Sequence, residues 1–249
     1  MSHEVEIGRG KRGRRAYTLD DVALVPSRRT RDPEDVNVGW QIDAYHVDIP
    51  LMAAPMDSVM SPDTAILVGR LGGIGVLDLE GLWTRYEGPA EALERIRAAA
   101  PEDATRVLQE VYRAPVRPEL IAARLARLGQ AGVVVSGRPS PAQTRRHWRP
   151  AVEAGVDLLV IRGSVVSAEH VSGNSEPLDL RRFIYELDVP VVVGGATTYT
   201  AALHLMRTGA AGVLVGQGGG ASSSVRQVLG LHLPMATAVA ADAAARRDY

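Results

Sequence analysis

Cysteine is absent from this chain of 249 residues, and two other residue types occur only once. Without a thiol, the chain forms neither disulfides nor zinc–thiolate sites, and it offers no cysteine nucleophile. Lys11 is the one lysine among 28 basic residues, and Phe183 is the one phenylalanine. The hydrophobic core must therefore be built mainly from valine, leucine, isoleucine and alanine.

A strong net charge and long apolar runs are absent as well. The formal net charge is −1, so no overall electrostatic field favours nucleic acid or an anionic membrane, and we expect neither as a partner. No apolar run approaches the roughly 18 residues of a membrane span. Residues 1–15 lack the apolar segment of a secretory signal, so we expect a cytoplasmic protein.

Six short apolar runs recur along the chain from residue 49 onward. Each is too short for a helix, and most are rich in β-branched residues. They lack strict alternation of apolar and polar residues, as expected for parallel strands covered on both faces. The runs are IPLMAA (49–54), GIGVLD (73–78), AGVVVSG (131–137), VDLLVIRG (156–163), VPVVVGG (189–195) and AGVLVG (211–216).

The segments between these runs carry helix signals. Ser61-Pro62-Asp63 provides an N-cap, a first-turn proline and a first-turn acid, and Ser140-Pro141 repeats this start. Strands that alternate with helices predict βαβ units and a parallel sheet. Helical spacing is present at 118–132, 178–188, 197–210 and 236–249. The stretch 80–130 is long for one crossover and has room for another element, and 106–113 within it is ambiguous.

This alternation predicts an α/β fold of the TIM (β/α)8 barrel type. Residues 1–48 form an irregular N-terminal arm in this interpretation, and residues 49–249 form a partial barrel. A closed barrel has eight strands, so the six runs predict a barrel truncated after about the sixth βα unit. An open sheet of this kind would expose two edges and an apolar barrel interior.

Two glycine-rich segments invite a nucleotide interpretation. GRGKRG (8–13) matches G-x-G-x-x-G, but no strand is predicted before it and no helix after it, so we interpret it as a basic arm. GQGGGASSS (216–224) follows the sixth predicted strand, where barrel loops build active sites and successive N–H groups can bind an anion. A flexible surface loop is the alternative, but the position favours a phosphate or nucleotide loop.

Two smaller features follow other predicted strands. Gly194 and Gly195 end the fifth, where glycine permits close approach by a ligand or close packing by a neighbouring element. Asp57, which follows the first, could bind a ligand hydroxyl, cap the next helix or make a structural hydrogen bond. The six histidines lack metal-binding spacing and no G-x-S-x-G elbow is present, so we predict neither a metal site nor a hydrolase triad.

Several longer motifs, in one order, resemble those of IMP dehydrogenases and GMP reductases. The chain is most similar to the short actinobacterial IMP dehydrogenase-related branch, which lacks CBS domains and the catalytic cysteine. The resemblance implies a purine nucleotide (IMP or GMP) as a partner, NAD or NADP as cofactor, and a homo-oligomer. The motifs are YTLDDVALVPSRRT (17–30), IPLMAAPMDSVMSPDTAILVGRLGGIGVL (49–77), AGVDLLVIRG (154–163), VPVVVGGATT (189–198) and the segment 208–239.

The resemblance also assigns roles to residues. In the family, a loop cysteine attacks the purine nucleotide and hydride passes to or from a nicotinamide. The position of that cysteine is Ser223, whose hydroxyl is a much poorer nucleophile without an adjacent base. Arg162, Gly163 and Ser164 lie on the nicotinamide side, with Arg162 in place of an aspartate. Positions that match the nucleotide and phosphate site are Met56, Asp57, Gly194, Gly195, Gly216, Gly218 and Gly220; positions that depart from it are Ala54, Ala196 and Ala221.

Three hypotheses remain open at this point. The first is a purine nucleotide oxidoreductase of this family, against which Ser223 and Arg162 weigh. The second is a non-catalytic relative that binds purine nucleotides or other proteins, and the retained glycines fit it. The third is an inactive fragment.

Overall fold

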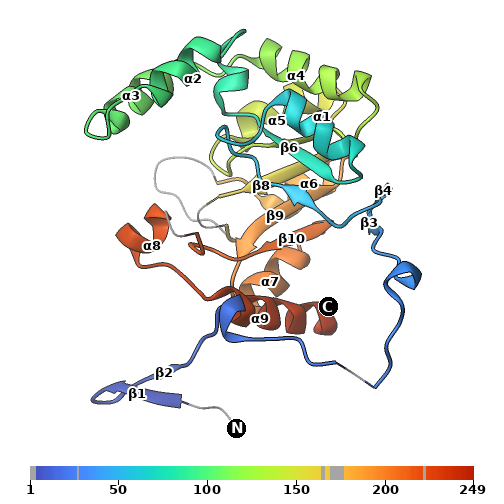
Figure 1. The fold of residues 1–249 in the computed structure, drawn as a ribbon, viewed down its shortest axis with the longest axis vertical. Helices are drawn as coiled ribbons and strands as arrows, with labels where there is room; N and C mark the ends of the chain where they lie inside the picture. The colour runs from blue at the N-terminus through green and yellow to red at the C-terminus, as the bar shows by residue number, and fades with distance from the viewer. Residues whose placement is uncertain (1–3, 27, 164–165, 169–176, 221–222) are drawn as a thin grey trace.

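The computed structural model describes residues 4–26, 28–163, 166–168, 177–220 and 223–249. Within these ranges, six strands form one parallel sheet that curls into a half-barrel (Figure 1). Each strand pairs with the one before it in the chain, in the order β10-β9-β8-β7-β6-β5. The strands are β5 (Met52–Ala53), β6 (Ile74–Asp78), β7 (Ser136–Arg138), β8 (Leu158–Arg162), β9 (Val191–Ala196) and β10 (Gly212–Val215).

All six predicted strands are confirmed, and so are the helices between them. Helix α1 begins after Ser61, whose hydroxyl accepts a hydrogen bond from the Thr64 N–H, as the sequence predicted. No helix in the described part of the chain is long and apolar enough to cross a membrane. The helices that follow the sheet strands are α1 (Pro62–Arg70), α4 (Pro118–Gln130), α5 (Thr144–Glu153), α6 (Leu180–Tyr185), α7 (Tyr199–Met206), α8 (Ser224–Leu229) and α9 (Met235–Asp248).

Helix α5 begins later than its sequence signal predicted. The Ser140-Pro141 start was expected to open it, but the first helical residue is Thr144. The reason is that the Ser140 side chain bonds to Glu80, across the neighbouring strand, and does not cap a helix. The Ser140 carbonyl instead accepts hydrogen bonds from the N–H and the hydroxyl of Thr144.

The long stretch 80–130 does contain extra elements, and they are helical. A short 3-10 helix, η3 (Leu82–Thr84), leads into α2 (Ala90–Arg97) and α3 (Ala104–Val111), which project from one end of the molecule (Figure 1). This excursion has a small core of its own, formed by Leu82, Ala92 and Val111. The ambiguous segment 106–113 therefore belongs mainly to a helix.

The prediction that the whole arm is irregular is wrong. It contains two antiparallel hairpins, formed by β1 (Glu4–Gly8) with β2 (Lys11–Arg14) and by β3 (Trp40–Ile42) with β4 (Tyr45–Val47). The 3-10 helices η1 (Leu19–Asp21) and η2 (Pro33–Asp35) lie between them. The G-x-G-x-x-G match is the turn region of the first hairpin, with Gly10 at φ +71°, and no helix follows it.

The second hairpin covers one end of the barrel interior. Ile42 and Val47 are buried against side chains of β6, β8 and β9, which explains how the expected exposure of an apolar interior is avoided there. The Tyr45 hydroxyl donates to Asp157 at 3.0 Å, and the other Asp157 oxygen accepts from the Val135 N–H at 2.8 Å. The sheet residues in this interior cluster are Ile74, Val76, Leu158, Val160 and Val192.

The other face of the sheet packs under the helices. Leu77, Leu159, Ile161, Val191 and Val193 belong to a large core that also contains side chains of α4, α6 and α7. The strands are therefore apolar on both faces, as the lack of alternation predicted.

Helix α9 buries a carboxyl group. It packs against α7, and Ala238, Asp242 and Ala245 are its buried residues. Asp242 is 3% exposed, and neither of its carboxylate oxygens has a hydrogen-bond partner among the described residues. Burial raises the pKa of this carboxyl from 3.8 to about 6.

We predict that Asp242 makes the protein less stable as the pH rises. Because its folded pKa lies above the unfolded one, the folded state holds the proton more tightly and the free energy of unfolding falls between about pH 4 and 7. Asp242→Asn should raise that free energy by about 2 kcal/mol at pH 8 and change it little at pH 4. Urea unfolding at both pH values measures this, with Glu91→Gln on an exposed helix face as control. A gain of equal size at both pH values would contradict it.

Candidate functional site

A cleft of about 780 Å³ opens at the carboxyl ends of the sheet strands. This is the position that the barrel architecture predicted for a site. Its wall takes residues from the ends of five strands and from the loop after β10. These are Ala53, Ala54 and Pro55 at β5, Arg138 at β7, Arg162 and Gly163 at β8, Gly195 at β9, and residues 215–220 at β10.

Most of the predicted site residues meet in this cleft, and three do not. Met56, Asp57 and Gly194 are not among its lining residues. Ser164 and Ala221 lie outside the described residues. The predicted residues that do line it are Arg162, Gly163, Gly195, Gly216, Gly218, Gly220 and Ser223.

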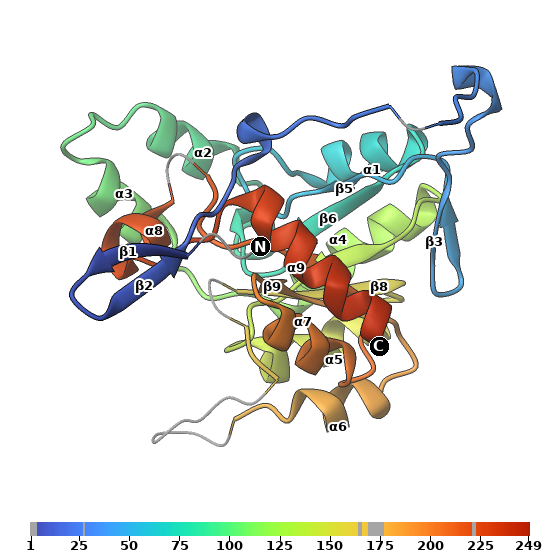
Figure 2. The same ribbon diagram turned by 90° about the horizontal axis from the view of Figure 1, so that it is seen from below.

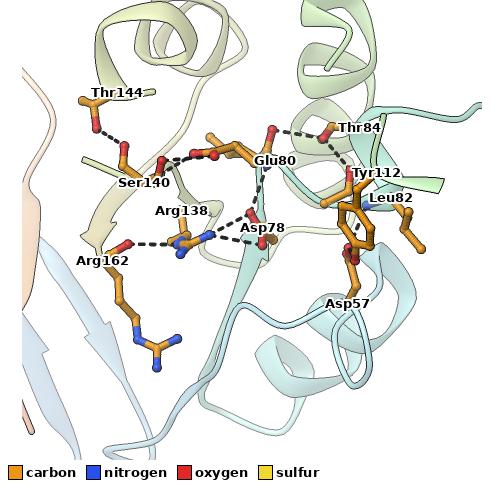
Figure 3. A network of polar contacts seen from close by, with 12 residues as sticks. Asp57, Asp78, Glu80, Leu82, Thr84, Tyr112, Arg138, Ser140, Thr144 and Arg162 are labelled. Carbon is orange, nitrogen blue, oxygen red and sulfur yellow. Dashed lines mark hydrogen bonds and ion pairs between the residues drawn. The ribbon is translucent and has the colours of Figure 1, made fainter. Parts of the chain in front are cut away.

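Asp57 has a structural role in this protein. Its carboxylate accepts hydrogen bonds from the Leu82 N–H at 2.8 Å and from the Tyr112 hydroxyl at 2.6 Å (Figure 3). A Cβ added to Gly81 would overlap that carboxylate. Burial, and then the hydrogen bond to Asp57, raises the pKa of Tyr112. Asp57 thus ties the loop after β5 to the start of the α2–α3 excursion, and Ser61 caps the next helix.

The glycines of the cleft fall into two groups. A Cβ added to Gly195 would overlap the carbonyl oxygen of Gly216, and one added to Gly218 would overlap that of Leu231. Gly216 has φ +107°, and a Cβ added to it would lie 2.5 Å from the methyl carbon of Met235. Packing against the backbone therefore requires glycine at positions 195 and 218, and the positive φ favours glycine at position 216. A Cβ added to Gly219 or Gly220 would meet nothing within 4 Å, and both residues are exposed.

An ion pair that the sequence analysis missed supports the rim of the cleft. The Arg138 Nη1 lies 3.2 Å from each oxygen of Asp78, and the Arg138 Nε donates to the Arg162 carbonyl at 3.2 Å (Figure 3). Burial raises the pKa of Asp78, and the Arg138 charge works against that rise. Asp78, Arg138 and Arg162 are the last residues of three adjacent strands, which is the signal that could have revealed them.

Glu80 extends this network to the next loop. Its carboxylate accepts hydrogen bonds from the N–H and the hydroxyl of Ser140 (Figure 3). Its carbonyl accepts from the Arg85 Nε at 2.9 Å, and another Arg85 nitrogen donates to the Tyr112 carbonyl at 3.0 Å. These contacts hold the loops after β6 and β7 against each other. They therefore fix the backbone at Arg138, the last residue of β7.

The cleft is rich in positive charge. Arg138, Arg162 and Arg226 line it, with His232 beside the glycine loop and Asp20 as the lining residue with an acidic side chain. Arg162 and Arg226 have no acidic partner within the part of the chain that the structure describes. Guanidinium groups in a cleft of this volume suit an organic anion, because arginine binds phosphate and carboxylate oxygens in a bidentate manner.

Among the described residues, Ser223 has no neighbour that could activate it as a nucleophile. It lines the cleft just before α8, and its hydroxyl makes no hydrogen bond to a histidine or carboxylate among the described residues. His232, the histidine of the cleft, faces the Gln217 carbonyl at 3.4 Å. Without a base within reach, a serine hydroxyl stays protonated and weakly nucleophilic.

Comparison with known proteins identifies the family. The family model described as IMP dehydrogenase / GMP reductase domain matches residues 16–249. The chain belongs to this family. The match begins at the arm and ends with α9, so it includes every strand that contributes to the cleft.

Relatives in the IMP dehydrogenase/GMP reductase family carry general names. An uncharacterized oxidoreductase of Mycobacterium tuberculosis is 50% identical over 98% of this chain, and one of Mycobacterium leprae is 51% identical over 98%. The chain covers 67% of each. A solved IMP dehydrogenase/GMP reductase-like protein of Corynebacterium glutamicum is 47% identical, with a TM-score of 0.91 over 99% of this chain and 65% of its own.

We predict that removing the Arg138 charge destabilises the protein in a pH-dependent way. Arg138→Met leaves Asp78 without its cation, so the pKa of Asp78 rises further above its unfolded value and the free energy of unfolding falls as the pH rises. We expect a loss of about 2–3 kcal/mol at pH 8 and a smaller loss at pH 5. Urea unfolding measures both.

The matched control is Arg127→Met, which removes an exposed ion pair with Asp63 and should cost less than about 1 kcal/mol. A loss from Arg138→Met that is the same at pH 5 and pH 8 would show that Asp78 does not depend on the arginine.

Proposed function

We propose that this protein binds a purine nucleotide, IMP or GMP, in the cleft at the carboxyl ends of the strands. The observation that carries the proposal is the meeting of Arg138, Arg162 and Arg226 with an accessible glycine backbone in one cleft. Both kinds of group suit a nucleotide phosphate, because backbone N–H groups and guanidinium groups each donate to its oxygens. The relatives include inosine-5'-monophosphate dehydrogenases, which supports a purine base.

The phosphate in this proposal lies near Gly219 and Gly220. These residues are the ones whose glycine character the packing does not explain, whereas Gly195, Gly216 and Gly218 are needed by the fold. The assignment narrows the predicted phosphate site to one end of the loop after β10.

The proposal does not include a covalent step. The chain has no cysteine, and Ser223, at the predicted nucleophile position, has no base bonded to it among the residues that the structure describes. A nucleotide can still bind, because binding draws on the shape and hydrogen-bond donors of the cleft, whereas attack on a purine ring carbon draws on a thiolate.

A nicotinamide cofactor, which the names of the relatives suggest, fits this cleft only in part. Arg162 ends β8 and lines the cleft, so a cationic oxidised nicotinamide ring placed beside it would meet a like charge. The pyrophosphate of such a cofactor would suit the same guanidinium. We therefore derive no hydride-transfer step for these residues.

Two further expectations accompany the proposal. Family membership leads us to expect a homo-oligomer, and the N-terminal sequence leads us to expect a cytoplasmic location.

We predict that IMP or GMP raises the thermal midpoint of the purified protein, since a ligand that binds only the folded state stabilises it. Arg162→Met should weaken nucleotide binding about tenfold, as expected when a charge-assisted hydrogen bond is lost. Arg181→Met, at an exposed arginine on α6 away from the cleft, is the control. Calorimetry with IMP, GMP and inorganic phosphate measures the affinities, and no shift with any purine nucleotide would refute the proposal.

The second candidate is the oxidoreductase that the mycobacterial names state. If the protein oxidises IMP, incubation with IMP and NAD or NADP should produce the 340 nm absorbance of the reduced cofactor. We expect none, for lack of a thiolate. NADH formation that disappears in Ser223→Ala would overturn the non-covalent proposal and assign Ser223 a catalytic role.

A further inference from the structure

The N-terminal arm is fastened to the start of helix α9. The Tyr17 N–H donates to the Thr237 hydroxyl oxygen at 2.8 Å, and the Thr237 N–H donates to the Tyr17 carbonyl at 3.3 Å. These residues are 220 positions apart in the sequence. Figures 1 and 2 both show the arm passing over this end of α9.

This contact replaces a missing helix cap. The first N–H groups of a helix have no partner within it, and a side chain before the helix usually accepts from one of them. The residue before α9 is Pro234, which has no such side chain. The Tyr17 carbonyl takes over that role for Thr237, so the arm and the helix stabilise each other.

Two hydrogen bonds close a turn of the arm just beyond the contact. The Asp21 carboxylate accepts hydrogen bonds from the Thr18 N–H at 2.8 Å and from the Thr18 hydroxyl at 2.9 Å. These hydrogen bonds lower the pKa of Asp21, so the carboxylate stays ionised at neutral pH. The turn they form, η1, therefore has a defined direction as it leaves Tyr17.

The turn forms part of the cleft wall. Thr18, Leu19 and Asp20 line the cleft together with Arg162, the glycine loop and Arg226. Pro234 and Met235, at the start of α9, line it too. The Tyr17–Thr237 contact thus joins two parts of the wall that come from opposite ends of the sequence.

We propose that residues 17–21 are a recognition wall for the nucleotide, held in place by the Tyr17–Thr237 contact, and that Asp20 accepts hydrogen bonds from the ribose hydroxyls. The inference rests on the proposed nucleotide binding. A nucleotide presents an anionic phosphate and neutral hydroxyl donors. The arginines and the glycine loop suit the phosphate, and Asp20 is the carboxylate that a hydroxyl donor can meet in the described wall. Thr237 and Tyr17 are positioning residues in this account.

Thr237→Val tests the contact with little change of shape. It removes the oxygen that accepts from the Tyr17 N–H and keeps the Thr237 N–H, whereas Thr237→Ser keeps both groups. We expect Thr237→Val to weaken IMP binding about fivefold and Thr237→Ser to restore it. Unfolding without ligand, measured in parallel, shows whether each variant is folded.

Limited trypsin digestion separates a role of the Tyr17–Thr237 contact in nucleotide recognition from a role in stability alone. The quantity measured is the protection that IMP gives to the bond after Arg15. Arg15 lies two residues before Tyr17, so IMP bound against residues 17–21 should slow cleavage after Arg15 in the wild type by covering this segment. In Thr237→Val this protection should be lost, as followed by mass spectrometry of the released N-terminal peptide. Equal protection in both proteins would overturn the role of the contact.

Asp20→Asn tests the recognised group. If Asp20 accepts from the 2'-hydroxyl, the variant should lose about tenfold in affinity for IMP and little for 2'-deoxy-IMP. Equal losses for both nucleotides, or no loss, would overturn the assignment of Asp20. If the wild type binds no purine nucleotide at all, the proposed function itself has failed. If the wild type binds IMP only as tightly as the Thr237→Val and Asp20→Asn variants do, the proposed function stands and the role of residues 17–21 has failed.

Discussion

Burial of both faces of the curled parallel sheet is the constraint on which the rest of this structure depends. The strands present Ile74, Val76, Leu158 and Val160 to the interior and Leu159 and Ile161 to the helices, so they have no face left for polar groups. Charged residues can therefore be accommodated in such strands only at the ends, where their side chains reach solvent or the cleft. Asp78, Arg138 and Arg162 do so side by side, and the cleft forms where they emerge.

Several sequence features were ambiguous because one residue type serves two purposes. Glycine permits a ligand to approach and also permits two backbones to pack, and the pattern alone does not separate these uses. The structure separates them at the loop after β10, where Gly216 and Gly218 face other atoms of the chain and Gly219 and Gly220 face none. Asp57 was ambiguous in the same way, and its bonds to Leu82 and Tyr112 give it a structural role.

Local sequence signals were misleading where the decisive contacts are distant along the chain. Ser140 carries a helix-start signal, yet Glu80, sixty positions earlier, takes its side chain. The sequence of the arm predicted an irregular segment. Its second hairpin instead covers the barrel interior, and its turn at residues 18–20 lines the cleft. Local propensity is a weak guide when a tertiary hydrogen bond or buried contact competes with it.

The sequence by itself determined the six strands, their order, the family and the absence of a thiolate. Strand patterns and motifs depend on residues close together in the sequence, and composition needs no structure at all. Only the tertiary structure decided that Arg138 and Asp78 support the rim, that Tyr17 meets Thr237 and that the arm lines the cleft. The physical reason is that periodicity records which side of an element is buried. It does not record which remote segment covers that side, and the wall of this cleft combines residues from Thr18 at one end of the sequence to Met235 near the other.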